Sequence, residues 1–427
     1  MLAPFRHRNF TLLWLGGVIS FTGDWMLFVA LPVYAYTVTG SPLATGIMLA
    51  ARLLPELLFG SVAGIFVDRW DRRRVLIGTN LTLAAVLLPL LAVHSARFLP
   101  VVYGVAFVES TVAQLLTAEK ALLPTLVPED QLVATNSLNS LNQNLARLAG
   151  LASAGILMAT VGLHGVTIVD YITYLVAAAA ATMMRLPATL HPVEVEAVEV
   201  TARRVKAAWT EWLAGLSIIR DNRLIRAIFC AFALQALAEG VVGPLFAPFA
   251  ITILHGGSQA FGWLLSAQAI GGVAGSLIIA AMASRIKPVA LFVAGLLLLG
   301  VVDMVIWNVP LLPVDLLLMA LIGAPVAGLQ AGALTLMQLG VPDKFRGRVM
   351  GALWTSMSPT MLIGLVVSST LGLQAGIVRM LTISGALNVL AGLVALVLMR
   401  RQAPQASEAP LPVDTSTIGA VSESAVH

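Results

Sequence analysis

The chain has 427 residues, of which 59% are hydrophobic and 11% charged, and its formal net charge is +4. Soluble domains usually carry about 25% charged residues, so this composition, with a mean hydropathy of +0.92, excludes an ordinary soluble protein. The single cysteine, Cys230, excludes an intramolecular disulfide. The basic residues are spread along the loops, so we expect no nucleic-acid partner.

Continuous apolar runs recur along the chain and are long enough to cross a bilayer. A spanning helix needs about 20 mostly apolar residues, and lipid admits only helices or closed barrels. Runs such as 76–93 do not show the alternation of barrel strands. We therefore predict an all-α membrane protein with twelve transmembrane helices. They are expected at residues 10–36, 43–67, 75–94, 98–119, 131–160, 163–185, 224–252, 259–283, 288–308, 312–340, 346–373 and 377–400.

Lysine and arginine gather on one set of predicted loops. Of the 25 basic residues, 21 fall on the side that holds both termini, whereas Arg97 and Arg379 fall on the other side. Cytoplasmic loops carry the excess of basic residues, so we predict that both termini are cytoplasmic. The first apolar run is too long for a cleavable signal peptide. The expected location is the cell inner (plasma) membrane.

Four segments are predicted along the chain. Residues 1–186 form an N-terminal half of six helices, and residues 223–401 form a C-terminal half of six helices. Between them, residues 187–222 form a cytoplasmic linker whose second part has the pattern of an amphipathic interfacial helix. Residues 402–427 are small and polar and are expected to be a disordered tail.

Short matches recur between the two halves at offsets of 211 to 216 residues. Residues 127–129 read VPE and residues 341–343 read VPD, and Gly46 matches Gly262. The matches predict two pseudo-symmetric halves. That arrangement is typical of secondary transporters, whose binding sites lie between the repeats near the bilayer midplane.

The segment after the second predicted helix reads GSVAGIFVDRWDRRR at residues 60–74. An acid at a helix C-terminus is unfavourable there, so Asp68 is expected to have another partner. The run resembles the signature of the major facilitator superfamily, which in that family is a conformational latch of the outward-open state. The residues that match are Gly64, Asp68, Arg69, Arg72 and Arg73.

Other stretches resemble the branch of enterobactin exporters and macrolide efflux proteins within that superfamily. They are residues 39–42, 121–124 with 127–129, 209–222 and 345–349. The resemblance covers nearly the whole chain and implies the twelve-helix major facilitator fold. Two features depart from a standard drug/proton antiporter. Gly150 is followed by Leu151 where exporters have proline, and Glu109 lies in the fourth helix, where an arginine is often found.

Six acids and two bases are placed at bilayer depth within the predicted helices, away from the helix ends. Charged groups at bilayer depth are costly and usually functional. Arg52 and Glu56 are spaced i, i+4 and are expected to pair, and Arg147 is expected to neutralise Asp24 or Glu109. The other acids are Glu239, with Asp170 and Asp303 placed nearer the outer surface.

Acids without a basic partner are candidates for binding protons or cations. We predict Asp24, Glu109 and Glu239 as those sites, against the alternative that each serves packing or helix pairing. The polar side chains predicted to line the cavity are Gln114, Gln235 and Gln268.

Signatures of enzymes are absent from the sequence. No phosphate-binding loop occurs, and the six histidines show no metal-ligand spacing. We therefore expect no enzyme, no cofactor and no metal site.

These patterns favour a secondary transporter that exports a small amphipathic or lipophilic compound (a drug, an antibiotic or a siderophore-like molecule) by alternating access. Protons are the expected coupling ions, the lipid bilayer is the surrounding partner, and a monomer is expected. Two alternatives remain: nutrient uptake by symport or facilitated diffusion, and a non-transporting membrane sensor or assembly protein.

Overall fold

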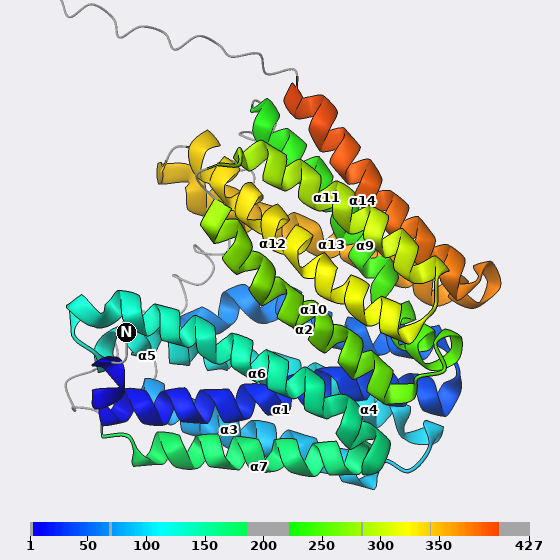
Figure 1. Ribbon diagram of the computed structural model, residues 1–427. Helices are drawn as coiled ribbons and strands as arrows, with labels where there is room; N and C mark the ends of the chain where they lie inside the picture. The colour runs from blue at the N-terminus through cyan, green and yellow to red at the C-terminus, as the bar shows by residue number, and fades with distance from the viewer. Residues whose placement is uncertain (1–2, 68–70, 186–221, 283–284, 342, 401–427) are drawn as a thin grey trace, which may run out of the picture.

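The computed structural model describes residues 3–67, 71–185, 222–282, 285–341 and 343–400 (Figure 1). These residues form helices and connecting turns, without a strand among them. Both predicted flanking segments, the linker at 187–222 (except Asn222) and the tail at 402–427, lie outside the described residues.

Twelve long helices dominate the described chain. The first six are α1 (Arg8–Thr39), α2 (Pro42–Val67), α3 (Arg72–Leu87), α4 (Leu99–Ala113), α6 (Leu132–Thr160) and α7 (Gly162–Met183). The second six are α9 (Arg223–Pro248), α10 (Gly257–Met282), α11 (Pro288–Asn308), α12 (Leu312–Gly340), α13 (Asp343–Ala375) and α14 (Ile377–Arg400). The predicted all-α class with twelve membrane helices is confirmed.

One boundary was predicted wrongly. The fourth helix was expected to run to residue 119, but α4 ends at Ala113. A short 3₁₀ turn, Gln114–Leu116, follows it, and then a separate helix α5, Thr117–Leu126. The apolar pattern continues through this break, so hydrophobicity alone did not reveal it.

Eleven spans among the described residues are long and apolar enough to cross a membrane. The long helix that falls outside this group is α6. Its first half is rich in asparagine, glutamine and serine, which lowers its hydropathy.

The two sets of six helices repeat one another. The starting residues of paired helices differ by 211 to 216 positions, from α1 with α9 to α7 with α14. Packing repeats as well, because α1 contacts α6 and α7 while α9 contacts α13 and α14. This repetition is the pseudo-symmetry that the sequence offsets predicted.

Local sequence explains how the first helix ends. The chain turns at Gly40, whose φ of 65° is left-handed, and its N–H donates to Tyr36 O at 2.7 Å. Glycine is the residue that takes this C-terminal conformation without strain. Pro42 then opens α2 in the position where proline is favoured, because its missing N–H would have no helical partner.

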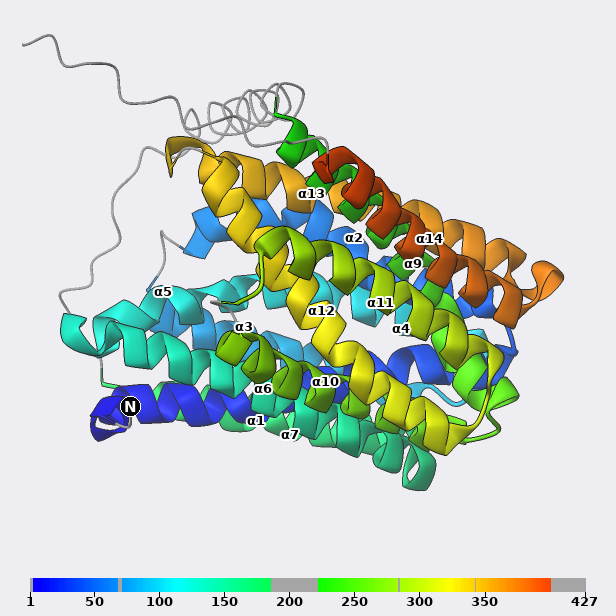
Figure 2. The same cartoon turned by 45° about the horizontal axis from the view of Figure 1, so that its top comes forward.

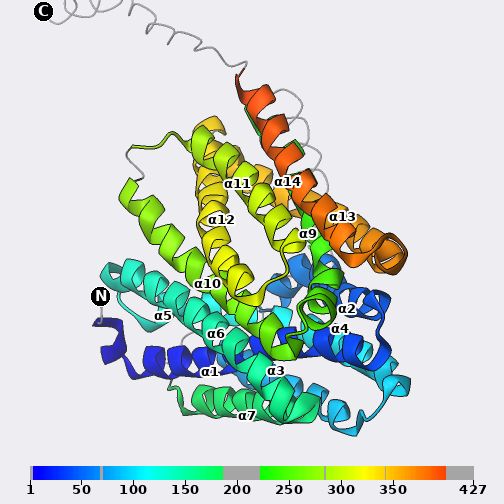
Figure 3. The same ribbon diagram turned by 45° about the vertical axis from the view of Figure 1, so that its right-hand side comes forward.

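The halves contact each other through α2 with α13 and through α6 with α10. Both contacts involve glycines where a Cβ would overlap the partner helix: Gly46 against Ser369, and Gly155 against Ser258 and Gln259. Gly46 is near the start of α2 and Gly155 near the end of α6, so both contacts lie at the end of the bundle remote from the termini. Figures 1 and 3 show the two sets of helices meeting there and diverging toward the end that carries the N-terminus. Figure 2 shows the same arrangement from another side.

Candidate functional site

Arg52 and Glu109 form an ion pair inside the N-terminal half. Arg52 Nη1 on α2 lies 3.4 Å from Glu109 Oε2 on α4, and the two side chains are 18% and 2% exposed. Arg52 also lies over the ring of Phe28, 5.7 Å from its centroid. Neither of the two facing ion-pair atoms makes a hydrogen bond. The contact therefore compensates charge without fixing a hydrogen-bond geometry.

The predicted pair between Arg52 and Glu56 is wrong. Both side chains leave α2 one turn apart, but Glu56 is exposed and Arg52 reaches α4 instead. The i, i+4 spacing on one helix makes a pair possible. A buried acid on a neighbouring helix attracts the same arginine more strongly, because that acid is removed from solvent.

Asp24 and Asp170 extend this group across α1 and α7. Tyr174 Oη donates a hydrogen bond to Asp24 Oδ1, and Thr173 Oγ1 donates to Asp170 Oδ1 at 3.0 Å. Asp170 is fully buried, and its Oδ2 has no hydrogen-bond partner. The charges of Asp24, Glu109 and Asp170 act on one another. We call Asp24, Arg52, Glu109, Asp170 and Tyr174 the N-terminal acid network.

A glycine allows α1 to approach the Asp170 carboxylate. A Cβ at Gly23 would overlap Asp170 Oδ1 and Thr173 Oγ1. Asp170 therefore lies beside the middle of α1, at the level of Asp24. The expectation that Asp170 lies nearer the outer surface is corrected by this contact.

Arg147 has no acidic partner among the described residues. It was expected to neutralise Asp24 or Glu109, but Glu109 pairs with Arg52 and Asp24 accepts from Tyr174. The guanidinium of Arg147 lies over the Trp25 ring, 5.2 Å from its centroid. Its Nε is buried without a hydrogen-bond acceptor. The side chain of Arg147 thus makes a cation–π contact where an ion pair was expected.

Two acids of the C-terminal half have amide partners. Gln235 Nε2 donates to Glu239 Oε1 at 3.1 Å, one turn apart on α9. Asn388 Nδ2 on α14 donates to Asp303 Oδ2 on α11 at 3.0 Å. The charge of Glu239 acts on Asp303. Glu239 is exposed in the structure, whereas Asp303 is buried.

The three predicted glutamines lie on different helical segments. Gln114 donates to Ser110 O at 3.2 Å on its own helical segment, and Gln235 supports Glu239. Gln268 is half-buried on α10.

The signature loop is described in part. Gly64 lies in α2, whereas Asp68 and Arg69 lie outside the described residues. Arg72 is the first residue of α3, and Arg73 donates to Ala181 O from Nε at 3.0 Å and to Thr182 O from Nη2. Arg73 thus satisfies carbonyls at the C-terminus of α7, where a cation is favourable.

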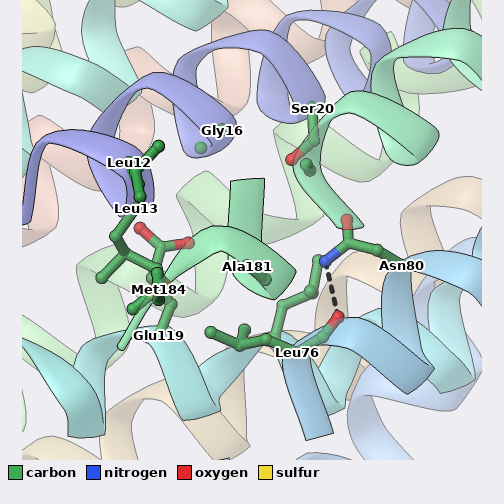
Figure 4. A pocket seen from close by; sticks show the side chains of 12 residues that line it. Leu12, Leu13, Gly16, Ser20, Leu76, Asn80, Glu119, Ala181 and Met184 are labelled. Carbon is green, nitrogen blue, oxygen red and sulfur yellow. Dashed lines mark hydrogen bonds between the residues drawn. The ribbon is translucent and has the colours of Figure 1, made fainter. Parts of the chain in front are cut away.

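A small cavity lies within the N-terminal half, between α1, α3, α5 and α7. Figure 4 shows Ser20, Asn80 and Glu119 around it. Its volume is about 20 Å³, and Asn80 is tied to Leu76 O by a hydrogen bond of 2.8 Å. A space of that size holds one water and no larger solute.

A larger pocket of about 420 Å³ lies at the end where the halves meet. It is lined by α1 and α7 residues of the N-terminal half and by Ile251, Gly257 and Ser258 of the C-terminal half. His94 and His164 lie together in its wall, with ring centroids 5.0 Å apart. No cluster of three metal-ligating side chains occurs in the described part of the chain.

The sequence contained signals for two residues that it did not assign to the site. Asp170 was a charged residue within a predicted helix, and Tyr174 follows it by one helical turn. Their contacts with α1 depend on which faces of the two helices meet, and a single sequence does not give that.

Comparison with known proteins agrees with this architecture. A family model described as "Transmembrane secretion effector" matches residues 1–418. Macrolide efflux protein A of Streptococcus pyogenes is 24% identical over 394 residues, covering 90% of this chain and 95% of that protein. Multidrug efflux pump Tap of Mycobacterium tuberculosis is 28% identical over 372 residues, covering 84% and 86%.

Among solved structures, a bacterial homologue of the iron transporter ferroportin in its inward-facing state has a TM-score of 0.69 and 16% identity. The match covers 92% of this chain and 98% of that one. The likeness supports the fold. With the family model spanning nearly the whole sequence, the chain belongs to the transmembrane secretion effector family of major facilitator transporters, which are multi-pass membrane proteins and not enzymes.

Proposed function

We propose that this transporter is a proton-coupled exporter of a small amphipathic or lipophilic compound, working by alternating access in the cell inner membrane. Two relatives named for macrolide and multidrug efflux support the export direction. The observation that carries the coupling is the N-terminal acid network, which holds three carboxyl groups and one arginine, and that arginine pairs with Glu109.

The charge balance of that network favours proton binding. Arg52 offsets Glu109 only, so Asp24 and Asp170 would add two uncompensated negative charges inside the membrane if both were ionised. Uncompensated charge at that depth is costly, and nearby like charges disfavour one another. Protons bound at Asp24 and Asp170 remove that cost in one state of the cycle, and Glu239 is the proposed proton site of the other half.

The positions of the basic residues support an orientation for this cycle. With 21 of 25 lysines and arginines on the side of the termini, the end at which the halves diverge faces the cytoplasm. The structure then corresponds to an inward-facing state. Substrate enters from the cytoplasm, and rocking of the halves about their contacts opens the other side.

Arg73 and the rest of the signature loop have a conformational role in this proposal. Arg73 holds the C-terminus of α7 against the start of α3. The latch assigned to Gly64, Asp68, Arg69 and Arg72 by resemblance acts at the same cytoplasmic side and biases the equilibrium between the two states.

Drug-susceptibility profiling of cells with and without the gene selects the compound for a flux test. Purified protein in proteoliposomes should then move that compound against its gradient when a pH gradient is imposed. Asp24→Asn should abolish the response to the gradient, whereas the exposed acid of the short turn before α6, changed as Asp130→Asn, should leave it intact. Flux that ignores the gradient in the unaltered protein would refute proton coupling, and gradient-driven uptake would favour symport.

A further inference from the structure

Helix α6 has two different exposed faces. One is a polar stripe at spacings of four, three and four residues, formed by the exposed Asn136, Ser140 and Gln143 and ending at the half-buried Arg147. The other is an apolar face formed by Leu141 and Leu145, exposed by 47% and 41%, and the exposed Ser137 and Asn144 lie between the two faces. Residues at such spacings share one side of a helix, so the polar stripe and the apolar face are distinct surfaces.

The contacts of α6 fix the direction of the polar stripe. On one side α6 holds α1, where Asn142 Nδ2 donates to Trp14 O at 2.6 Å. On another side it meets α10 through Gly155. At 100° per residue the stripe lies between these two directions, toward the space from which the halves diverge, while Leu141 and Leu145 point to the lipid. Polar side chains are disfavoured against acyl chains, which agrees with this assignment.

Arg147 ends the stripe at its innermost point and is the least compensated charge there. Arg52 has Glu109, but Arg147 has no carboxylate within ion-pair distance among the described residues. Stacking on Trp25 covers one face of its guanidinium and leaves the in-plane N–H groups to seek acceptors. An arginine left this way at membrane depth is costly unless an anion joins it.

We propose that Arg147 and Trp25 form a binding site for the anionic group of the transported compound, which is therefore an amphipathic carboxylate or a similar acid. The guanidinium takes the carboxylate in a forked pair of hydrogen bonds, and the Trp25 ring packs against the apolar body. Asn136, Ser140 and Gln143 line the approach from the end that carries the termini. This inference rests on the proposed transport function and names its substrate class.

An anionic lipid headgroup offers the same chemistry as a free carboxylate, so the binding test is made in two membranes. The protein is placed in nanodiscs of phosphatidylcholine alone and in nanodiscs that also contain phosphatidylglycerol. If the site binds a free solute, its affinity for that solute should be the same in both kinds of nanodisc. Loss of solute binding when phosphatidylglycerol is present would identify the occupant as lipid and overturn the proposal.

Three probes with one apolar body separate charge from hydrophobicity: pyrenebutyrate, pyrenebutanol and pyrenebutylamine. Equilibrium binding to the unaltered protein, without a pH gradient, should favour pyrenebutyrate over both others by about tenfold. Arg147→Gln should remove that preference, and Arg147→Lys should keep part of it, since lysine retains the charge without the fork. The matched control is Arg97→Gln, an exposed arginine at the opposite end of the bundle, which should change nothing.

The proposal fails if the unaltered protein binds pyrenebutyrate no better than pyrenebutanol, or binds none of the probes. It also fails if Arg147→Gln, folded as judged by its unfolding temperature, keeps the preference. If that variant does not fold, the three-probe series on the unaltered protein and on Arg147→Lys decides alone. Because no gradient is applied, absent proton coupling leaves this result unaffected, whereas gradient-driven flux without carboxylate preference would overturn only the anion site.

Discussion

The two halves share a fold but compensate the acids within their helices differently. Asp24 and Glu239 are each the seventeenth residue of their helices, α1 and α9. In the N-terminal half the acids contact an arginine and a tyrosine. Among the described residues of the C-terminal half, the partners of Glu239 and Asp303 are a glutamine and an asparagine.

The difference continues at other equivalent positions. Gly23 and Asp170 face each other in the N-terminal half, and the residues 215 positions later are Ala238 and Gly385. No carboxylate therefore stands in the C-terminal half where Asp170 stands in the N-terminal half. The repeated fold supplies the same scaffold twice, and side-chain substitutions concentrate charge in one copy.

The largest expected loss of stability comes from removing an acid that pairs with an arginine. Removing an acid whose partner is a neutral amide should cost less. Glu109→Gln leaves Arg52 as a buried charge without its partner and should lower the free energy of unfolding by about 3 kcal/mol. Asp303→Asn removes a charge that only an amide contacts and should change it by about 1 kcal/mol or less. Unfolding of the two variants in detergent measures both. The double variant Arg52→Gln/Glu109→Gln should recover part of the loss, and equal losses for Glu109→Gln and Asp303→Asn would contradict the comparison.

A smaller loss is expected from filling the space beside Asp170. Gly23→Ala places a methyl group against the carboxylate and should cost about 1–3 kcal/mol of unfolding free energy, because the neighbours must shift. Gly78→Ala on α3 is the control, since nothing lies within 4 Å of its Cβ. That control should be neutral or stabilising by up to about 1 kcal/mol. Thermal unfolding of both variants in one detergent gives the contrast, and a neutral Gly23→Ala would show that α1 and α7 are not tightly packed there.

Removing a single hydrogen bond to an acid should lower stability by a similar amount in either half. Its effect on transport should differ between the halves. Tyr174→Phe and Asn388→Ala each remove one donor to an acid and should each cost about 1–2 kcal/mol. Flux measured against the size of the pH gradient should change in Tyr174→Phe, whose acid is Asp24, and change less in Asn388→Ala. A stronger change in Asn388→Ala would move the proposed coupling to the C-terminal half.

The smallest effect is expected at the start of α3. Arg73→Lys keeps the charge at the C-terminus of α7 but loses the fork that reaches two carbonyls, so unfolding free energy should fall by about 0.5 kcal/mol. The corresponding residues of α11 are Pro288 and Val289, which have no such side chain. Val289→Ala therefore serves as the matched control. Equal small losses in both variants would mean that the carbonyl contacts add nothing measurable.

Hydrophobicity predicted nearly all of the fold, because each membrane helix must satisfy its own backbone hydrogen bonds within one apolar segment. The break between α4 and α5 was missed, since it lies inside a continuous apolar pattern. Helix α6 was found despite its polar stripe, because apolar residues such as Leu141, Leu145 and Leu148 recur at helical spacing.

The sequence predicted which acids belong to the candidate site but not which residues contact them. Asp24, Glu109 and Glu239 were identified as charges inside helices, which one sequence reveals directly. Their partners were not, because Arg52 pairs across helices with Glu109 and not along its own helix with Glu56.

By itself, the sequence determined the twelve helices, their repetition and the expected orientation, since these follow from local hydrophobicity, offsets and charge counts. Only the tertiary structure decided that Asp170 and Tyr174 join Asp24 and that Arg147 lies on Trp25 without an acid. It also decided that the described helices of the two halves meet at the end remote from the N-terminus. Those features depend on which helix faces meet, and helix faces meet according to side-chain shape across segments far apart in the chain.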